Sequence, residues 1–178
     1  MRDFECTGHQ VVSHHRIFDV ITESYVHRPD GKEHTFVVLD SADWVNVVPV
    51  TDEGRVVLVR QFRPGTREVT IEVPGGMVEP SETDPARAAA RELEEETGYV
   101  AERIEKMRSI RPNPAFIRNW HHMFMAFGAR PVGRMRMDEG EDVVPFEASW
   151  EEVDKMVRDG LITHALCLTA LMFARYFR

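Results

Sequence analysis

The sequence has little cysteine and no long apolar segment. Only two cysteines, Cys6 and Cys167, occur in 178 residues, and their distant positions fit neither a disulfide framework nor a metal-binding cysteine pair. We expect both to be free thiols, with Cys167 in the core of a helix. No apolar run approaches the ~20 residues of a membrane-spanning helix, and the N-terminal MRDFECTGHQ lacks the apolar core of a signal peptide. These absences predict a cytoplasmic protein without a membrane partner.

Positive charge is also scarce. The chain has 22 Lys and Arg against 30 Asp and Glu, a net charge of -8, and this balance argues against binding to a nucleic-acid backbone. A phosphorylated small molecule remains a suitable ligand, provided that metal ions neutralise the charge of the encounter. The length fits one domain with room for a small additional subdomain.

Turn and strand signals divide the chain at about residue 40. Residues 16–25 are strand-like, PDGK is a turn signal, and HTFVVLD continues as a second strand. We therefore expect residues 1–40 to form an N-terminal β hairpin extension. Residues 41–178 alternate strand patterns with one internal helix and end in two further helices, which indicates an α/β layered domain. The later strands are expected at about 105–110, 121–127 and 141–146.

The segment RELEEETG concentrates negative charge on one helix, which we expect at residues 85–97. Asp84 with Pro85 forms an N-cap signal, and Gly98 occupies the position of a left-handed C-terminal cap. A helical projection predicts a core face of apolar and small residues beside an arc of acidic residues. The core face is Ala86, Ala89, Ala90, Leu93 and Thr97, and the acidic arc is Glu92, Glu95 and Glu96.

Such crowding of carboxylates needs a cation. Like charges four residues apart, such as Glu92 and Glu96, oppose helix formation by roughly 0.2–0.5 kcal/mol. A solvated face with arginine partners is one interpretation. The other is a site for a hard divalent cation such as Mg²⁺, which prefers oxygen ligands.

Nine positions within residues 76–99 resemble the sequence box of the Nudix hydrolases. Tyr99 stands where that box usually has an aliphatic residue, and eight residues rather than seven separate Glu82 from Arg91. The resemblance implies a Nudix α/β/α sandwich with a mixed sheet and an N-terminal β hairpin subdomain. The matching positions are Gly76, Glu82, Arg91, Glu92, Leu93, Glu95, Glu96, Gly98 and Tyr99.

The same resemblance implies a role for each residue of the site. Mg²⁺ is the implied cofactor, with Mn²⁺ as the alternative, and Glu95 is either a ligand or an orienter of metal-bound water. Glu139 is the implied catalytic base, with Asp138 as a substitute, and Glu82 is expected to pair with Arg91. The implied metal ligands are the Gly75 carbonyl, Glu92, Glu95, Glu96 and Glu141, and the structural positions are Gly76, Glu82, Arg91 and Gly98.

Segments outside the box resemble the ADP-ribose and nucleoside-diphosphate-sugar pyrophosphatases. In VRQFRPGTREVTIEVPGG, the resemblance makes Arg63 and Glu72 substrate-binding residues, although the two could simply pair with each other. Met77 either lines the same pocket or packs. RPNPAFIRNWHHMFMA resembles the Pro-Asn-Pro-Ala form of some nucleotide-sugar hydrolases. Its Phe116 and Trp120 could stack on a base or sugar, but a place in the core is favoured.

The predicted function is Mg²⁺-dependent hydrolysis of the pyrophosphate bond in ADP-ribose or nucleotide sugars, which gives a nucleoside monophosphate and a sugar phosphate. The alternatives are a non-catalytic Nudix sensor that binds ADP-ribose and a nucleoside triphosphate or dinucleotide pyrophosphohydrolase. Related pyrophosphatases dimerise through a similar N-terminal extension. We therefore expect a homodimer in which the hairpin of one chain helps form the substrate pocket of the other.

Overall fold

The structure, a computed structural model, describes residues 3–133, 135–136 and 142–177. The chain divides into two compact units. The first unit comprises Met1–Asp43 together with Ile110–Trp120, and the second comprises Trp44–Ser109 and His121–Arg178. Residues 110–120 thus belong to the N-terminal unit, whereas the predicted extension ended at residue 40. A role of this unit in dimerisation or substrate binding stays a prediction.

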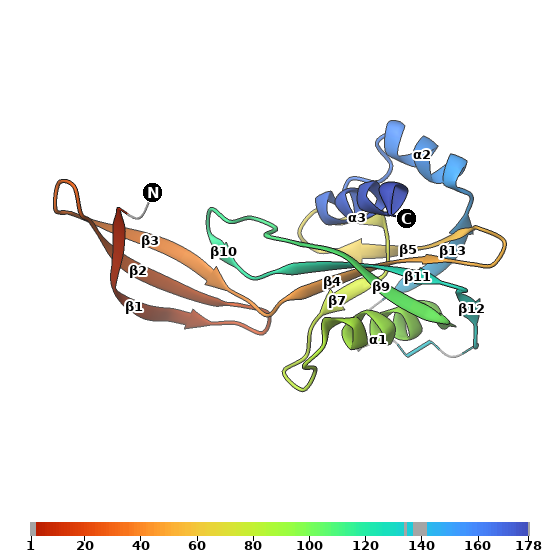
Figure 1. The fold of residues 1–178 in the computed structure, drawn as a ribbon, viewed down its shortest axis with the longest axis horizontal. Helices are drawn as coiled ribbons and strands as arrows, with labels where there is room; N and C mark the ends of the chain where they lie inside the picture. The colour runs from red at the N-terminus through yellow and green to blue at the C-terminus, as the bar shows by residue number, and fades with distance from the viewer. Residues whose placement is uncertain (1–2, 134, 137–141, 178) are drawn as a thin grey trace. The chain divides into compact units, whose positions relative to one another are not determined.

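The first unit is a small sheet (Figure 1) with strand order β1-β2-β3-β10. The expected hairpin is present as β2 and β3, which are antiparallel and joined at a turn where Gly31 has φ 67°. The sequence reading missed β1, because this strand is exposed along almost its whole length and so lacks an alternating apolar pattern. The strands are β1 (Phe4–His14), β2 (Asp19–His27), β3 (Lys32–Asp40) and β10 (Ile117–Arg118).

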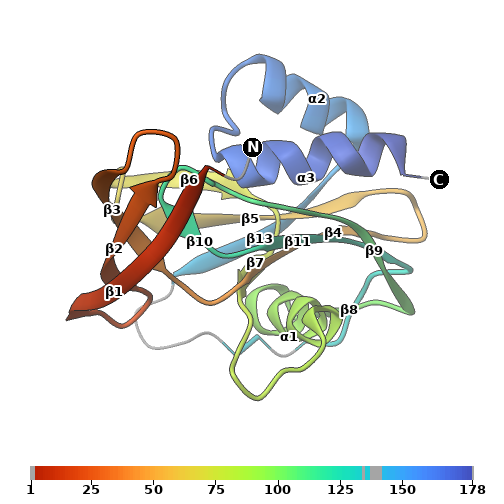
Figure 2. The ribbon, with the colours of Figure 1, turned by 60° about the vertical axis from the view of Figure 1, so that its left-hand side comes forward.

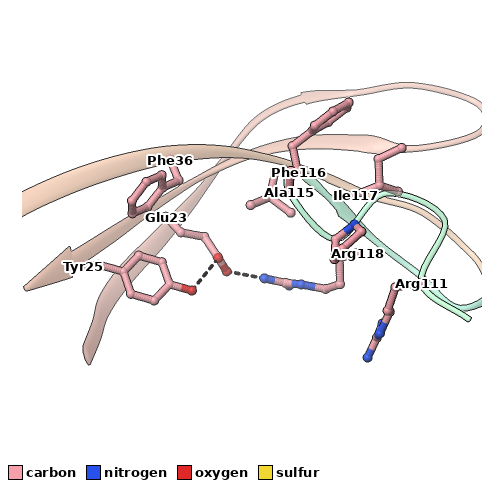
Figure 3. Close-up of a pocket in the computed structure, with 10 residues that line it drawn as sticks. Glu23, Tyr25, Phe36, Arg111, Ala115, Phe116, Ile117 and Arg118 are labelled. Atoms are coloured by element: carbon pink, nitrogen blue, oxygen red, sulfur yellow. Dashed lines mark hydrogen bonds and ion pairs between the residues drawn. The ribbon is translucent and has the colours of Figure 1, made fainter. Parts of the chain in front are cut away.

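The expected core positions of Phe116 and Trp120 are wrong. Their side chains are 44% and 40% exposed, because no helix of the first unit covers this segment in the described part of the chain. The Arg111 guanidinium lies 3.7 Å from the ring centroid of Trp120, in a cation-π contact. Phe116 lines a pocket of about 370 Å³ that also involves Tyr25 and Phe36 (Figure 3).

Polar side chains also line this pocket. The Tyr25 hydroxyl donates to Glu23 at 2.9 Å, and Arg118 pairs with the same carboxylate (Figure 3). The hydrogen bond to Glu23 and then burial raise the pKa of Tyr25 to about 12. Tyr25 is therefore a neutral donor in the first unit.

The second unit is a layered sandwich around a mixed sheet (Figure 2). β4 and β11 are parallel, whereas β5 is antiparallel to β13 and β6. α1 covers one face of the sheet, and α2 and α3 lie over the other. The predicted Nudix α/β/α architecture with a mixed sheet is confirmed. The elements are β4 (Trp44–Val50), β5 (Val56–Arg63), β6 (Glu68–Glu72), β7 (Gly75–Met77), α1 (Pro85–Thr97), β8 (Tyr99–Val100), β9 (Arg103–Ile110), β11 (His121–Phe127), β12 (Arg130–Pro131), β13 (Val143–Ala148), α2 (Trp150–Arg158) and α3 (Ala165–Tyr176).

The predicted ends of α1 are confirmed, but one position of its core face is not. The Asp84 side chain accepts a hydrogen bond from the Ala86 backbone, and Gly98 is left-handed with φ 69°. Ala90 is exposed, whereas Ala88 is fully buried. Ala88 belongs to the core cluster that α1 forms with Val45, Val47 and Phe124 of β4 and β11, so the buried stripe extends to the side of the helix that carries Ala88.

Side chains of β11 and β8 extend the core of the second unit. Met123 and Met125 are buried in β11, and Tyr99 packs against the core cluster around Leu93. Both cysteines are free thiols, Cys167 buried and Cys6 exposed. None of the helices among the described residues has the length and apolar character needed to cross a membrane. A cytoplasmic location stays a prediction.

Candidate active site

Arg91 is the centre of the acidic arc on α1. Its Nε and Nη2 donate to the two oxygens of Glu82 at 3.0 and 3.2 Å, which is the predicted pairing. Its Nη1 donates to Glu92 at 2.8 Å and to Glu95 at 2.9 Å. Nη2 also donates to the carbonyl of Met77 at 2.9 Å. One guanidinium therefore ties the loop before the helix, strand β7 and two carboxylates of the arc together.

The electrostatics of this cluster favour the charged forms. Burial acts to lower the pKa of Arg91, but hydrogen bonds to Glu82 and Glu95 and the charge of Glu92 outweigh it, and the pKa is raised. Burial acts to raise the pKa of Glu82, but the hydrogen bonds from Arg91 outweigh it, and the pKa is lowered. The extra residue between Glu82 and Arg91 does not prevent the pairing.

Two glycines let β7 approach the helix. The backbone N–H of Gly75 donates to Glu96 at 3.0 Å, and Glu96 is only 4% exposed. A Cβ on Gly76 would lie 2.2 Å from Oε1 of Glu92, and a Cβ on Gly75 would lie 2.2 Å from the backbone oxygen of Val45. Only residues without a side chain allow this strand to pack against both β4 and the carboxylates.

The donor set at this place fits a hard divalent cation. Glu92, Glu95 and Glu96 sit on one arc of α1, and Gly75 brings backbone to Glu96. Magnesium-type ions are held by carboxylates and carbonyl oxygens and keep waters for substrate phosphates. One arginine contacts several acids, so the arc retains negative charge for a cation. Glu139 and Glu141, the predicted base and additional ligand, lie outside the described residues.

Arg63 and Glu72 form a second ionic contact in the same unit. Arg63 donates from Nε and Nη2 to the two oxygens of Glu72, both at 2.7 Å, and Thr70 donates to Oε1 at 2.6 Å. Glu72 is 1% exposed, whereas the Arg63 side chain is 41% exposed. The hydrogen bond to Glu72 is the main cause of the raised pKa of Arg63, and the charge of Glu96 contributes. The pairing between the strands is therefore present, and Arg63 is electrostatically coupled to the helix arc.

The buried Glu72 stays ionised through its donors. Burial acts to raise its pKa, but hydrogen bonds from Arg63, His164 and Thr70 outweigh burial, and the pKa lies well below the usual value. Met77, the third predicted substrate-binding residue, is 37% exposed at the end of β7.

The sequence reading missed two polar residues under the glycine turn. The Nδ2 group of Asn46 donates to the carbonyl of Pro74 at 3.4 Å, and Nε2 of His121 donates to Oδ1 of Asn46 at 2.8 Å. Burial, followed by the charge of His164, lowers the pKa of His121 to about 4, so its ring is neutral at neutral pH. The available signal was a single asparagine inside the apolar strand DWVNVVPV, since a buried polar residue needs a partner.

Several known proteins are similar to this chain. It is 32% identical over 159 residues to the ADP-ribose pyrophosphatase of Bacillus subtilis (strain 168), which covers 89% of this chain and 85% of that protein. It is 30% identical over 149 residues to the methanol dehydrogenase activator of Bacillus methanolicus, with 83% and 80% covered. It is 31% identical over 154 residues to the ADP-sugar pyrophosphatase of Mus musculus, with 80% and 68% covered. A crystal structure described as an ADP compounds hydrolase has a TM-score of 0.86 and 20% identity over 99% of this chain and 95% of that one.

A mixed sheet lies between helices, and a glycine turn packs against an acidic helix whose carboxylates suit a divalent cation. The model described as NUDIX domain matches residues 41–170. The chain belongs to the Nudix hydrolase family and is a pyrophosphohydrolase, which confirms the predicted family. Nudix hydrolases generally use divalent metal ions.

The glycine turn yields a prediction with internal controls. Gly75→Ala places its Cβ against backbone, so we expect a loss of about 1–3 kcal/mol in unfolding free energy, the usual cost of overpacking. Gly76→Ala meets the end of a flexible side chain, so stability should change less while turnover falls about 10²-fold, because Glu92 is displaced. Urea denaturation and steady-state assays measure the two effects.

Gly65→Ala is the matched control, because no heavy atom lies within 4 Å of its added Cβ. It should change neither stability nor turnover. Equal losses of stability in Gly75→Ala and Gly76→Ala would contradict the assigned contacts.

Proposed function

We propose that this Nudix hydrolase cleaves the pyrophosphate bond of ADP-ribose and related nucleotide sugars and releases a nucleoside monophosphate and a sugar phosphate. The observation that carries the proposal is the acidic arc on α1, held by Arg91 against the glycines of β7. The names of the Bacillus subtilis and mouse relatives support the substrate class. Mg²⁺ is the proposed ion, with Mn²⁺ as the alternative.

In this proposal, the ligands of the ion are Glu92, Glu96 and the Gly75 carbonyl, and Glu95 either is a further ligand or orients a metal-bound water. The bound ion would lower the pKa of an attacking water and neutralise charge in the transition state. Arg91 holds the arc in place through its hydrogen bonds, so the carboxylates need little rearrangement when substrate arrives. Glu141 is proposed as an additional ligand from outside the helix.

Arg63 and Glu72 are proposed to act together on the substrate. The Arg63 guanidinium is half-exposed and positively charged. Its N–H groups could donate hydrogen bonds to a diphosphate or ribose oxygen of the substrate. Glu72 is almost fully buried and accepts hydrogen bonds from Nε and Nη2 of that guanidinium. Its proposed contribution is therefore to orient Arg63. Met77 is proposed to line the same pocket.

The proposed catalytic base lies outside α1. Glutamates that hold metal ions are poor bases, because their lone pairs and charge are already engaged. The segment MDEGEDVV supplies Glu139 and Glu141 beside Gly140. Glu139 is therefore proposed as the base, with Asp138 as the substitute.

We also propose a homodimer through the first unit. β1 lies at the edge of its sheet, and strand edges readily pair with another chain. The unit exposes apolar side chains on both faces of its sheet, since neighbours such as Phe36 and Val37 point to opposite faces, and exposed apolar residues are typical of protein interfaces. In the proposed dimer, this unit of one chain contributes to the substrate pocket of its partner. The exposed apolar residues are Phe4, Val11, Val12, Ile17, Phe36 and Val37.

The substrate proposal is tested by release of mononucleotide from a panel of substrates with Mg²⁺. We expect ADP-ribose and nucleotide sugars to be cleaved faster than nucleoside triphosphates and dinucleotides. Glu96→Gln should lower kcat more than about 100-fold, because losing even a partner of a metal ligand costs 10–100-fold. It should remain folded, since the amide oxygen can still accept from Gly75.

Glu94→Gln is the control, because it lies in the same acidic segment but outside the arc. It should keep wild-type turnover. Faster cleavage of triphosphates or dinucleotides would favour the alternative hydrolase, and binding of ADP-ribose without cleavage would favour the sensor. Near wild-type turnover of Glu96→Gln at saturating Mg²⁺ would remove this residue from the site.

The base assignment predicts a separate kinetic signature. Glu139→Gln should lower kcat by about 10²–10⁴, the range for loss of general base catalysis, with KM and metal affinity unchanged. Glu141→Gln should instead raise the Mg²⁺ concentration that gives half activity. Steady-state kinetics over a Mg²⁺ series separate the two. Full kcat in Glu139→Gln would move the base to Asp138.

The dimer is tested by light scattering at micromolar concentration. Val37→Lys should shift the mass from dimer towards monomer, because it places a charge in the proposed apolar interface. Val144→Lys is a matched control, since Val144 in β13 is 52% exposed against 57% for Val37. A monomeric mass for fully active wild-type protein would refute the dimer.

A further inference from the structure

Three side chains of kinds that bind metal ions meet at Glu72, outside helix α1. Glu72, His164 and Cys167 each offer one ligand atom, and these atoms lie within 4.8 Å of one another. Glu72 comes from the end of β6, His164 is the N-cap of α3, and Cys167 lies in the first turn of that helix. The spacing of three residues puts the histidine and the cysteine on the same side of the helix start.

The three atoms converge closely. Nδ1 of His164 lies 2.9 Å from Oε2 of Glu72 and 3.2 Å from Sγ of Cys167, and Sγ lies 3.6 Å from the same Oε2. In a tetrahedral Zn²⁺ site, such ligand atoms are separated by roughly 3.3–3.6 Å, given the usual Zn–N, Zn–O and Zn–S bond lengths. Shifts of less than about 0.5 Å would fit an ion of this size.

We propose that Glu72, His164 and Cys167 form a second metal site, for a thiophilic divalent ion of the Zn²⁺ class. The nitrogen, sulfur and oxygen donors are those that Zn²⁺ takes, whereas Mg²⁺ prefers oxygen alone. Three protein ligands leave a fourth position for water. His164, with a side chain 37% exposed, gives the ion access from solvent.

A bound metal ion would replace protons that these side chains carry in its absence. Burial and then the charge of Glu72 raise the pKa of the Cys167 thiol well above its ordinary value, so without an ion the sulfur keeps its proton. A coordinated Zn²⁺ deprotonates a thiol outright. The ion would take the place of the thiol proton and of the proton on Nδ1 of His164: the thiol proton would be released, and the neutral imidazole would carry its proton on Nε2.

The arginine partner of Glu72 is compatible with the ion. Arg63 Nε and Thr70 both donate to Oε1, so these two bonds persist while the ion takes Oε2. The second bond of Arg63, from Nη2 to Oε2, then competes with the ion. Occupancy therefore loosens the bidentate pair without removing it.

Co²⁺ is the probe, used on the whole chain in excess Mg²⁺ so that oxygen-only sites are filled. A thiolate ligand to Co²⁺ gives a charge-transfer band in the near ultraviolet, and tetrahedral geometry gives intense visible bands. We expect both in wild-type protein, with Zn²⁺ bleaching them by displacement. The readout is optical, so it does not depend on which substrate the enzyme cleaves.

Variants assign the band to its ligands. Cys167→Ser should abolish it and Cys6→Ser should leave it unchanged, since these are the two thiols of the chain. His164→Ala should weaken Co²⁺ affinity more than about 100-fold, because even partners of ligands cost 10–100-fold. If Cys167→Ser fails to fold, His164→Ala still tests the proposal, since His164 is half-exposed. Absence of the band in wild type, its loss in Cys6→Ser, or wild-type affinity in His164→Ala would each overturn the proposal.

Discussion

The guanidinium of Arg91 is the contact on which the site depends. It faces Glu82 from the loop before α1, Glu92 and Glu95 from the helix itself, and the carbonyl of Met77 from β7. Carboxylates this close would repel one another and push the helix and the loop apart. Arginine suits the position because its planar fork has donors in several directions at once. Arg91 therefore holds the loop, the helix carboxylates and β7 together through its own hydrogen bonds.

The glycines of β7 also bring this strand close to the carboxylates of α1. The strand pairs with β4 on one side and lies against α1 on the other, so any side chain at Gly75 or Gly76 would strike backbone or carboxylate. Glu96 is buried by this approach and accepts a backbone hydrogen bond. The excess of carboxylate over guanidinium charge remains, and a divalent cation is the natural complement. The packing of β7 and the acidic surface that suits a cation thus have the same structural origin.

A second ionic contact links the sheet to the closing helix. Glu72 is buried beneath Arg63, and its other neighbours are His164 and Cys167 at the start of α3. A buried carboxylate is tolerated only when its hydrogen bonds are satisfied. The donors that satisfy it here come from three separate elements, so α3 helps to set the orientation of Arg63. The start of α3 is therefore linked to Arg63 through Glu72.

The sequence by itself determined the local features. Asp84 and Gly98 fix the ends of α1 through backbone capping, and the spacing of Glu92, Glu95 and Glu96 fixes their common arc, because both depend only on helix geometry. The family followed from this spacing together with the glycines before it.

Only the tertiary structure decided which neighbours these residues have. Ala88 is buried and Ala90 is exposed because α1 packs Ala88 against core residues of β4 and β11, and the sequence pattern contains no information about which side of the helix faces them. His121 and Asn46 meet from strands that are adjacent in the sheet but distant in the chain. The grouping of Glu72 with Cys167 joins residues 95 positions apart. Side-chain periodicity reports the faces of single elements, whereas such contacts arise from how the elements pack.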